Sequence, residues 1–252
     1  MLFIPLGFIF YHIFSQGIAV ISPTFLTHLP KPPGEIGGGL FNAIIGSVFL
    51  VSVASLMAIP VGIFAGIYLS EEKAHPLAYW VRICVDILQG TPSIVIGTIV
   101  YIWCVLPMGH FSALSGSIAL AIMMLPVIVR ATEETIKLVP ETLREASLAL
   151  GVPYHRTVLK VIVPSAFSGI LTAILISVAR VSGETAPLLF TAFGNSFLNF
   201  NALKPIAALP LVIFTYATSP YDDWHHMAWG ASVLLVGFIL TLSLVSKGFV
   251  KS

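Results

Sequence analysis

Residues 144–164 read REASLALGVPYHRTVLKVIVP, a stretch between long apolar runs that carries Arg144, Glu145, His155, Arg156 and Lys160. Pro140 suits the first position of a helix, and Pro153 suits the start of a second one. Gly151, between them, stands where a helix ends in a left-handed residue. The stretch therefore predicts two short helices joined by a glycine turn, over about 140–163, that stand off an apolar body.

The composition indicates a membrane protein. Of the 252 residues, 57% are hydrophobic and only 9% are charged, and the mean hydropathy is +0.99. An average soluble domain has about a quarter of its residues charged. We expect an all-α polytopic membrane protein with one transmembrane domain over 1–252. The net charge of +1 gives no reason to expect a nucleic-acid partner.

Six apolar segments are long enough to cross a bilayer, which takes roughly 20 residues each. The first is interpreted as a retained span, because no basic segment precedes it and no clear cleavage site follows it. The apolar piece at 206–216 is too short to cross alone, carries two prolines, and is interpreted as a re-entrant or surface segment. The six predicted spans are about 2–21, 40–69, 83–106, 112–131, 165–193 and 228–247.

Basic residues divide unevenly among the predicted loops. With both termini in the cytoplasm, nine of the 12 lysines and arginines lie on the cytoplasmic side, two lie outside and Arg180 lies within a span. This excess is typical of cytoplasmic loops, so the 144–164 stretch is predicted to be cytoplasmic. The cytoplasmic nine are Lys73, Arg82, Arg130, Lys137, Arg144, Arg156, Lys160, Lys247 and Lys251, and the outer two are Lys31 and Lys204.

The fifth predicted span contains an arginine and a glutamate, Arg180 and Glu184, one helical turn apart. A charge facing lipid is costly, so the two either neutralise each other and hold the helices together, or line a polar path and handle an anion. The second interpretation is favoured, because Thr185 and other small polar residues follow and Pro187 loosens the helix. Glu184 would then hold Arg180 in place or accept a proton from the anion.

Two further stretches carry proline and arginine near predicted membrane boundaries. Gly90 and Pro92 near the start of the third span are interpreted as a kink, and Arg130 at the end of the fourth as an interfacial anchor. The segment SPYDDWHHMAWG at 219–230 is predicted to be a solvated outer loop. A metal site there is the less favoured alternative.

The run EAS at 145–147, Gly151 three residues later, and VIVP at 161–164 resemble the EAA motif of ABC-importer permeases. That family's pattern is E-A-A, three residues, G, nine residues and I-x-L-P; here Ser147 replaces the second alanine, and valines replace Ile and Leu. The resemblance implies a helix that docks in a cleft of a separate ATPase subunit. The implied coupling residues are Arg144, Glu145, Ala146, Ser147 and Gly151. The alternative is an amphipathic helix lying on lipid headgroups.

A narrower resemblance rests on four segments in order: GTPSIVIG, LPVIVRATEE, REASLALG and ARVSGETAPLLFTA. Together they are similar to the PstA-type permeases of bacterial phosphate importers, over about 40–248. The resemblance implies a MetI-like permease core in the bacterial plasma (inner) membrane and inorganic phosphate as substrate, with Arg180, Glu184 and Thr185 along its path. It also implies three kinds of partner: a PstC-like permease subunit, two ATPase subunits and an extracytoplasmic phosphate-binding protein.

The chain itself shows no sequence signal of nucleotide chemistry. It contains no G-x-x-x-x-G-K-[ST] loop, so we expect no catalytic residues, no metal and no cofactor of its own, with ATP and Mg²⁺ bound by the ATPase. Three alternatives stay open: a related permease for molybdate or sulfate, an ion-driven secondary transporter or channel, and a scaffold that transports nothing. A secondary transporter often has two repeated halves, and such a repeat is not evident in this sequence. The charges at 180 and 184 argue against a scaffold that transports nothing.

Overall fold

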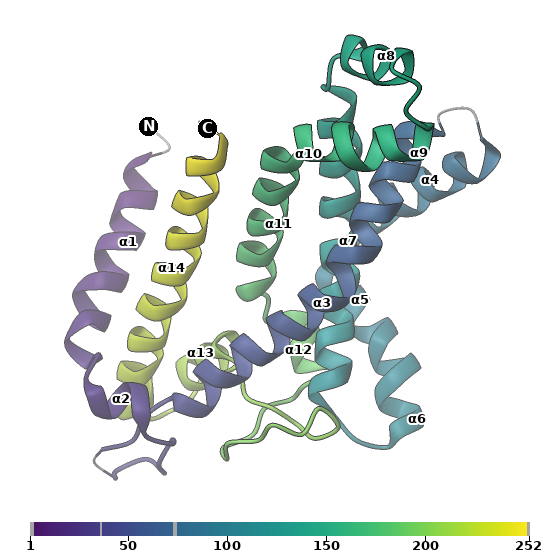
Figure 1. Cartoon of the computed structure of the whole chain (residues 1–252). Helices are drawn as coiled ribbons and strands as arrows, with labels where there is room; N and C mark the ends of the chain where they lie inside the picture. Colours follow the sequence, from purple (N-terminus) through teal and green to yellow (C-terminus); the bar gives the residue numbers. More distant parts are fainter. Residues whose placement is uncertain (1–2, 36, 73–74, 251–252) are drawn as a thin grey trace. The chain divides into compact units, whose positions relative to one another are not determined.

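The computed structural model describes residues 3–35, 37–72 and 75–250 (Figure 1). This part of the chain is helices and connecting loops without a β-strand; a single isolated bridge pairs Phe193 with Ile206. The all-α prediction is confirmed. Lys73 and Lys251 of the predicted cytoplasmic set, and the start of the first predicted span at Leu2, lie outside the described residues.

The helices follow one another along the chain with short breaks. The first half contains α1 (Phe3–Gly17), η1 (Ile18–Val20), α2 (Pro23–Thr27), α3 (Phe41–Glu71), α4 (Pro76–Gly90), α5 (Ser93–Val100), the π-helical η2 (Tyr101–Val105), α6 (Leu106–Met108) and α7 (Ala113–Lys137). The second half contains α8 (Glu141–Ala149), α9 (Tyr154–Thr157), the π-helical η3 (Val158–Ile162), α10 (Val163–Ser165), α11 (Phe167–Ser182), α12 (Ala186–Leu189), α13 (Leu209–Ala217) and α14 (Asp222–Val250).

Long apolar helices occupy several of the predicted spans. Within the described residues, α3, α7 and α14 are each long and apolar enough to cross a membrane, and two bent helix pairs raise the number to five. The first apolar segment is a shorter helix. The count of six spans therefore stays a prediction. So does the single transmembrane domain over 1–252.

Two predicted spans are broken, which corrects their boundaries. The third, expected over 83–106, begins inside α4, and the chain leaves the helix at Thr91 and Pro92 before α5. The fifth, expected over 165–193, is interrupted after Ser182 and continues as the short helix α12 from Ala186. In each case a proline removes a backbone donor close to the break, so one apolar run became two helices. The helices at the fourth and sixth predicted spans, α7 and α14, are longer than predicted, because polar residues continue each helix beyond its apolar part.

The described residues pack into two compact units. The first comprises Met1–Ala54, Pro92–Leu120 and Arg180–Thr241. In it, α1 lies beside the N-terminal part of α14 (Figure 1), where His12 and Trp229 meet edge to face at 5.0 Å. A buried cluster joins α2, α3, α13 and α14 around Phe25, Leu40 and Leu209.

The second unit comprises Ser55–Thr91, Ala121–Ala179 and Leu242–Ser252. Gly62 and Gly66 on α3 face α7 so closely that an added Cβ would lie 2.7 Å from Ile128 and 2.5 Å from Thr132. Small residues four apart allow such close helix contact in membranes. The two glycines therefore fix α3 against α7 within this unit, which also contains the short helices α8 and α9.

Candidate functional site

The glycine turn predicted at 151 is present. Gly151 has φ +75°, the left-handed region, and its N–H donates to the Leu148 carbonyl at 2.9 Å. An L-residue with a side chain avoids this conformation. The turn lets α8 end and α9 begin after Pro153, so the predicted pair of helices is confirmed in the second unit.

Arg144 clamps α8 to the end of α3. Its two terminal nitrogens donate to the two carboxylate oxygens of Glu71, each at 2.8 Å, and one of them also donates to the Tyr154 hydroxyl at 2.8 Å. The Tyr154 hydroxyl in turn donates to Glu71. The hydrogen bond to Glu71 is the main cause that raises the pKa of Arg144 above its ordinary value. A bidentate arginine–carboxylate pair fixes orientation as well as distance, so α8 is held in one direction.

A second contact holds the two short helices to each other. The hydroxyls of Ser147 on α8 and Thr157 on α9 lie 2.9 Å apart, and both side chains are buried. A buried hydroxyl pair of this kind satisfies groups that would otherwise lose their hydrogen bonds to water. Ser147 therefore points inward, as Arg144 does. We call α8, the turn at Gly151 and α9 together the joint.

Every residue of α8 except Arg144 and Ser147 is exposed, apolar and polar side chains alike. Leu143 is 42% exposed and Leu148 40% exposed, and Ala146 and Ala149 are exposed beside them. Glu145 is also exposed and makes no hydrogen bond or ion pair with any residue that the structure describes. Arg144 and Ser147 thus point to the chain's own body, while the opposite side of the helix, with Thr142, Glu145 and Ala149, is left uncovered by the residues that the structure describes.

Close to this joint, three cations surround one buried carboxylate. Glu133 on α7 is fully buried, and its carboxylate forms ion pairs with Arg82 Nε at 3.0 Å, Arg130 at 3.1 Å and Lys137 Nζ at 2.9 Å. Arg130 also pairs with Asp86 on α4. Arg130 is therefore part of an ion network that ties α4 to α7, rather than an isolated interfacial anchor.

In the first unit, the predicted pathway residues lie at a helix break. α11 ends at Ser182, and α12 begins at Ala186. Arg180 Nε lies 4.0 Å from Glu184 Oε1, and the two side chains are 51% and 20% exposed. Arg180 has no other partner among the described residues. A contact this long and open leaves the guanidinium donors available to another group.

Thr185 and the break line a cavity of 450 Å³, together with residues of α1, α13 and α14. Most of its lining is apolar, and neither Arg180 nor Glu184 is part of it. On the other side of the break, Gly97 of α5 approaches Pro187 so closely that a Cβ there would lie 2.6 Å from Pro187 Cα. The structure brings Arg180 and Glu184 together, and places Thr185 in a separate apolar cavity.

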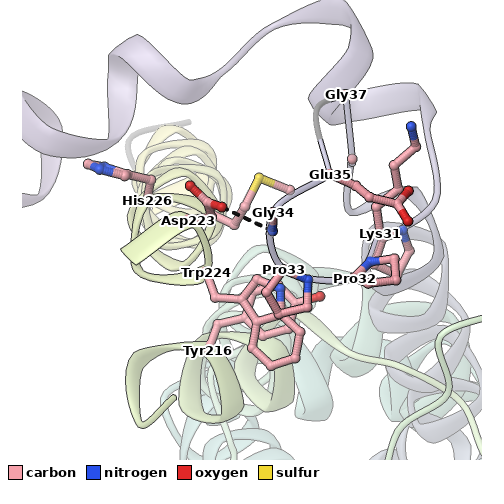
Figure 2. Close-up of a pocket in the computed structure, with 13 residues that line it drawn as sticks. Lys31, Pro32, Pro33, Gly34, Glu35, Gly37, Tyr216, Asp223, Trp224 and His226 are labelled. Carbon is pink, nitrogen blue, oxygen red and sulfur yellow. Dashed lines mark hydrogen bonds between the residues drawn. The ribbon is translucent and has the colours of Figure 1, made fainter. Parts of the chain in front are cut away.

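The predicted outer loop at 219–230 is largely helical, because α14 begins at Asp222. Figure 2 shows Asp223 pointing to the loop, where it accepts a hydrogen bond from Gly34 N at 3.2 Å, while His226 points away. These residues line a pocket of 290 Å³ whose wall includes Tyr216 stacked on Trp224 at 4.5 Å. No group of metal-ligating side chains is found among the residues that the structure describes.

A family model described as "Binding-protein-dependent transport system inner membrane component" matches residues 58–251. The chain belongs to this family. The match includes the helix pair with the glycine turn and the break at 183–185. The chain is accordingly a transport permease subunit of the inner membrane and not itself a catalytic enzyme.

Curated relatives extend over nearly the whole chain of this permease. The phosphate transport system permease protein PstA of Haemophilus influenzae is 43% identical over 245 residues, which is 97% of this chain and 86% of that protein. PstA of Xylella fastidiosa strain Temecula1 is 45% identical over 235 residues, 92% and 82% of the two chains. PstA 1 of Mycobacterium tuberculosis strain H37Rv is 36% identical over 248 residues, 96% and 80%.

Solved structures show the fold of the permease. An inward-facing MetNI methionine ABC transporter aligns with a TM-score of 0.70 at 19% identity and covers 84% of this chain and 94% of its own. An amino acid ABC transporter aligns with a TM-score of 0.60 at 18% identity. The predicted MetI-like permease fold is confirmed.

Sequence analysis did not identify several residues that hold the joint in place. Glu71, Tyr154 and Thr157 complete the α8 clamp, and Glu133 anchors the ion network. Glu71 is 73 positions from Arg144. The one local signal was the spacing of Arg130, Glu133 and Lys137 on one helical face.

Proposed function

We propose that the chain is the membrane-spanning subunit of an ATP-driven importer that carries inorganic phosphate inward and is coupled through α8 to a separate ATPase subunit. The observation that carries this proposal is the outward face of α8. It presents Glu145, Ala146 and Ala149 on a helix that Arg144 and Ser147 hold from behind. A face of small side chains that is already oriented suits insertion into a groove of another protein, because little ordering remains to be done on binding.

The proposed coupling residues act in two ways. Glu145 and Ala146 contact the ATPase, and Arg144, Ser147 and Gly151 set the position of the helix that carries them. ATP and Mg²⁺ are bound by the ATPase, since this chain has no phosphate-binding glycine loop in its sequence. Movement of the ATPase would then be transmitted through the Arg144–Glu71 pair to α3.

Phosphate as substrate is supported by the names of the relatives and by Arg180. A guanidinium stays charged and offers a planar fork that matches two oxygens of an oxyanion. Arg180 meets Glu184 only at 4.0 Å, so phosphate competes for it without breaking a close pair. Glu184 serves as the resting partner of Arg180 or as a proton acceptor. Thr185 belongs to the same break in the helix.

The proposed assembly contains a PstC-like second permease, two ATPase subunits and an extracytoplasmic phosphate-binding protein in a bacterial inner membrane. Both termini and α8 lie on the cytoplasmic side. The pocket around Tyr216 and Trp224 lies on the segment proposed to face outward, where the binding protein delivers phosphate (Figure 2).

Replacing Arg180 with glutamine is expected to lower phosphate uptake by roughly 10-fold or more, since a hydrogen bond to a charged group contributes about 1.5–3 kcal/mol. The measurement is labelled phosphate uptake by vesicles that hold the assembled transporter. Lys204→Gln, which removes an exposed cation elsewhere in the same unit, serves as the control and keeps its uptake. Unchanged uptake in Arg180→Gln would remove Arg180 from the path.

Binding of the ATPase is expected to protect Glu145 from carboxylate-modifying reagents. Glu145 is exposed and unpaired among the described residues, so it reacts freely in the permease alone. Site-resolved mass spectrometry compares its modification with and without the ATPase, and Asp222, 98% exposed on α14, is the reference that stays unchanged. Equal modification of Glu145 in both samples would instead favour a helix lying on lipid headgroups.

A further inference from the structure

The helix that follows the glycine turn changes direction sharply before the membrane-spanning segment. α9, η3 and α10 run on without a break from Tyr154 to Ser165, and this helix is bent by 65° from Phe167–Ser182. Ala166, just after Pro164, lies at the bend. Figure 1 shows the helix labelled α9 and α10 running across the end of α11 rather than continuing along it. A helix bent by 65° from an upright span runs more along the membrane surface than across it.

The two faces of this helix differ in character. Thr157, Val158 and Ile162 are buried against the chain's own body. On the outer face Arg156 and Lys160 are exposed, and Leu159 between them is 56% exposed. The outer face therefore combines two cations with an apolar side chain, as in helices that lie at a membrane interface.

The charges on this face have no counterpart among the residues that the structure describes. Neither Arg156 nor Lys160 makes an ion pair or hydrogen bond through its side chain with any residue that the structure describes. The other basic residues of this region are paired: Arg82, Arg130 and Lys137 with Glu133, and Arg144 with Glu71. No acidic residue occurs in the sequence between Glu145 and Glu184.

We propose that the face formed by Arg156, Leu159 and Lys160 binds anionic phospholipid headgroups of the leaflet nearest to it. Basic side chains at the surface are attracted by anionic lipid, and Leu159 enters the boundary between headgroups and acyl chains. The inference rests on the proposed function for its cytoplasmic orientation. It divides the joint into two surfaces: α8 meets the ATPase, and the helix over Tyr154–Ser165 rests on lipid and resists the movement that α8 receives.

The test uses the complete transporter, with ATPase, in vesicles containing equal amounts of phosphatidylglycerol and phosphatidylcholine. Cys84 and Cys104 are replaced by serine, and Leu159→Cys carries a fluorophore. Bromine atoms near the headgroup end of one lipid or the other quench the fluorophore on contact. We expect stronger quenching by brominated phosphatidylglycerol. The preference for phosphatidylglycerol over phosphatidylcholine near the fluorophore falls roughly fivefold for each charge removed, in Arg156→Gln and in Lys160→Gln. Lys247→Gln, an exposed cation on α14, leaves the preference unchanged.

Equal quenching by the two lipids, or a preference that survives loss of both charges, would overturn the proposal. Quenching by neither lipid would also overturn it. A second sample without the ATPase then shows whether a soluble quencher reaches the fluorophore only there, which would assign this face to the ATPase. Phosphate uptake is measured in the same vesicles. Absence of uptake with the lipid preference intact would count against the proposed transport function and not against the lipid contact.

Discussion

Replacing Gly151 with proline is expected to reduce ATP-driven uptake to background while the transporter still assembles and hydrolyses ATP. Proline holds φ near −65° and has no N–H, whereas Gly151 has φ +75° and donates to Leu148. The backbone would have to leave the left-handed conformation at residue 151, and the orientation of α8 relative to α9 would change. No atom lies within 4 Å of a Cβ at this position, so crowding does not cause the effect. Uptake and ATP hydrolysis are measured on the same vesicles.

The matched control is Gly151→Asn, because asparagine tolerates the left-handed conformation better than other residues with side chains. It should keep most of the coupled uptake. Coupled uptake at the normal ratio to ATP hydrolysis in Gly151→Pro would contradict the role of the joint. Loss of both activities together with loss of assembly would place Gly151 in folding rather than in coupling.

Replacing Glu133 with glutamine is expected to destabilise the permease by about 1–3 kcal/mol, because three cations that are 25–33% exposed lose a charged hydrogen-bond acceptor. Glu133 is fully buried and is shared by Arg82, Arg130 and Lys137. Glutamine keeps the size of the side chain, so no cavity forms. The purified variant should unfold at a clearly lower temperature in detergent, and less of it should assemble with its partners.

Glu134→Gln is the control for this change. Glu134 is the next residue on α7, is 64% exposed and, among the described residues, forms an ion pair with Lys137. Exposed ion pairs contribute about 0–1 kcal/mol, so this variant should unfold near the temperature of the unmodified chain. Equal stability of the two variants would show that the network around Glu133 contributes little.

Local features of the sequence predicted the joint, because the signals that make it are local. Gly151 needs no distant partner to favour a left-handed turn, and Pro140 and Pro153 set the helix starts by their own ring geometry. The same holds for the apolar length of α3, which matches its predicted span closely. Which face of α8 points inward was not predictable. The partners of Arg144 and Ser147 come from residues 71 and 157, far along the chain or beyond the turn.

The broken spans show a second limit of the sequence. Hydropathy treats the run through Gly90 and Pro92 as continuous, although each side forms a separate helix. Gly97 against Pro187 and Gly66 against Thr132 are close contacts between segments far apart in the chain. The two glycines at 62 and 66 have the spacing of a helix-packing motif, and that spacing is the signal that could have predicted the contact of α3 with α7.

The most direct test of the account is uptake by vesicles that hold this chain with its second permease, the ATPase and the binding protein. ATP is supplied on the ATPase side, and labelled phosphate, sulfate and molybdate are compared on the other. The account predicts ATP-dependent uptake of phosphate that is lost in Gly151→Pro. Uptake of another oxyanion instead would contradict the substrate assignment. Uptake that needs no ATP would contradict the coupling role of α8, the central claim.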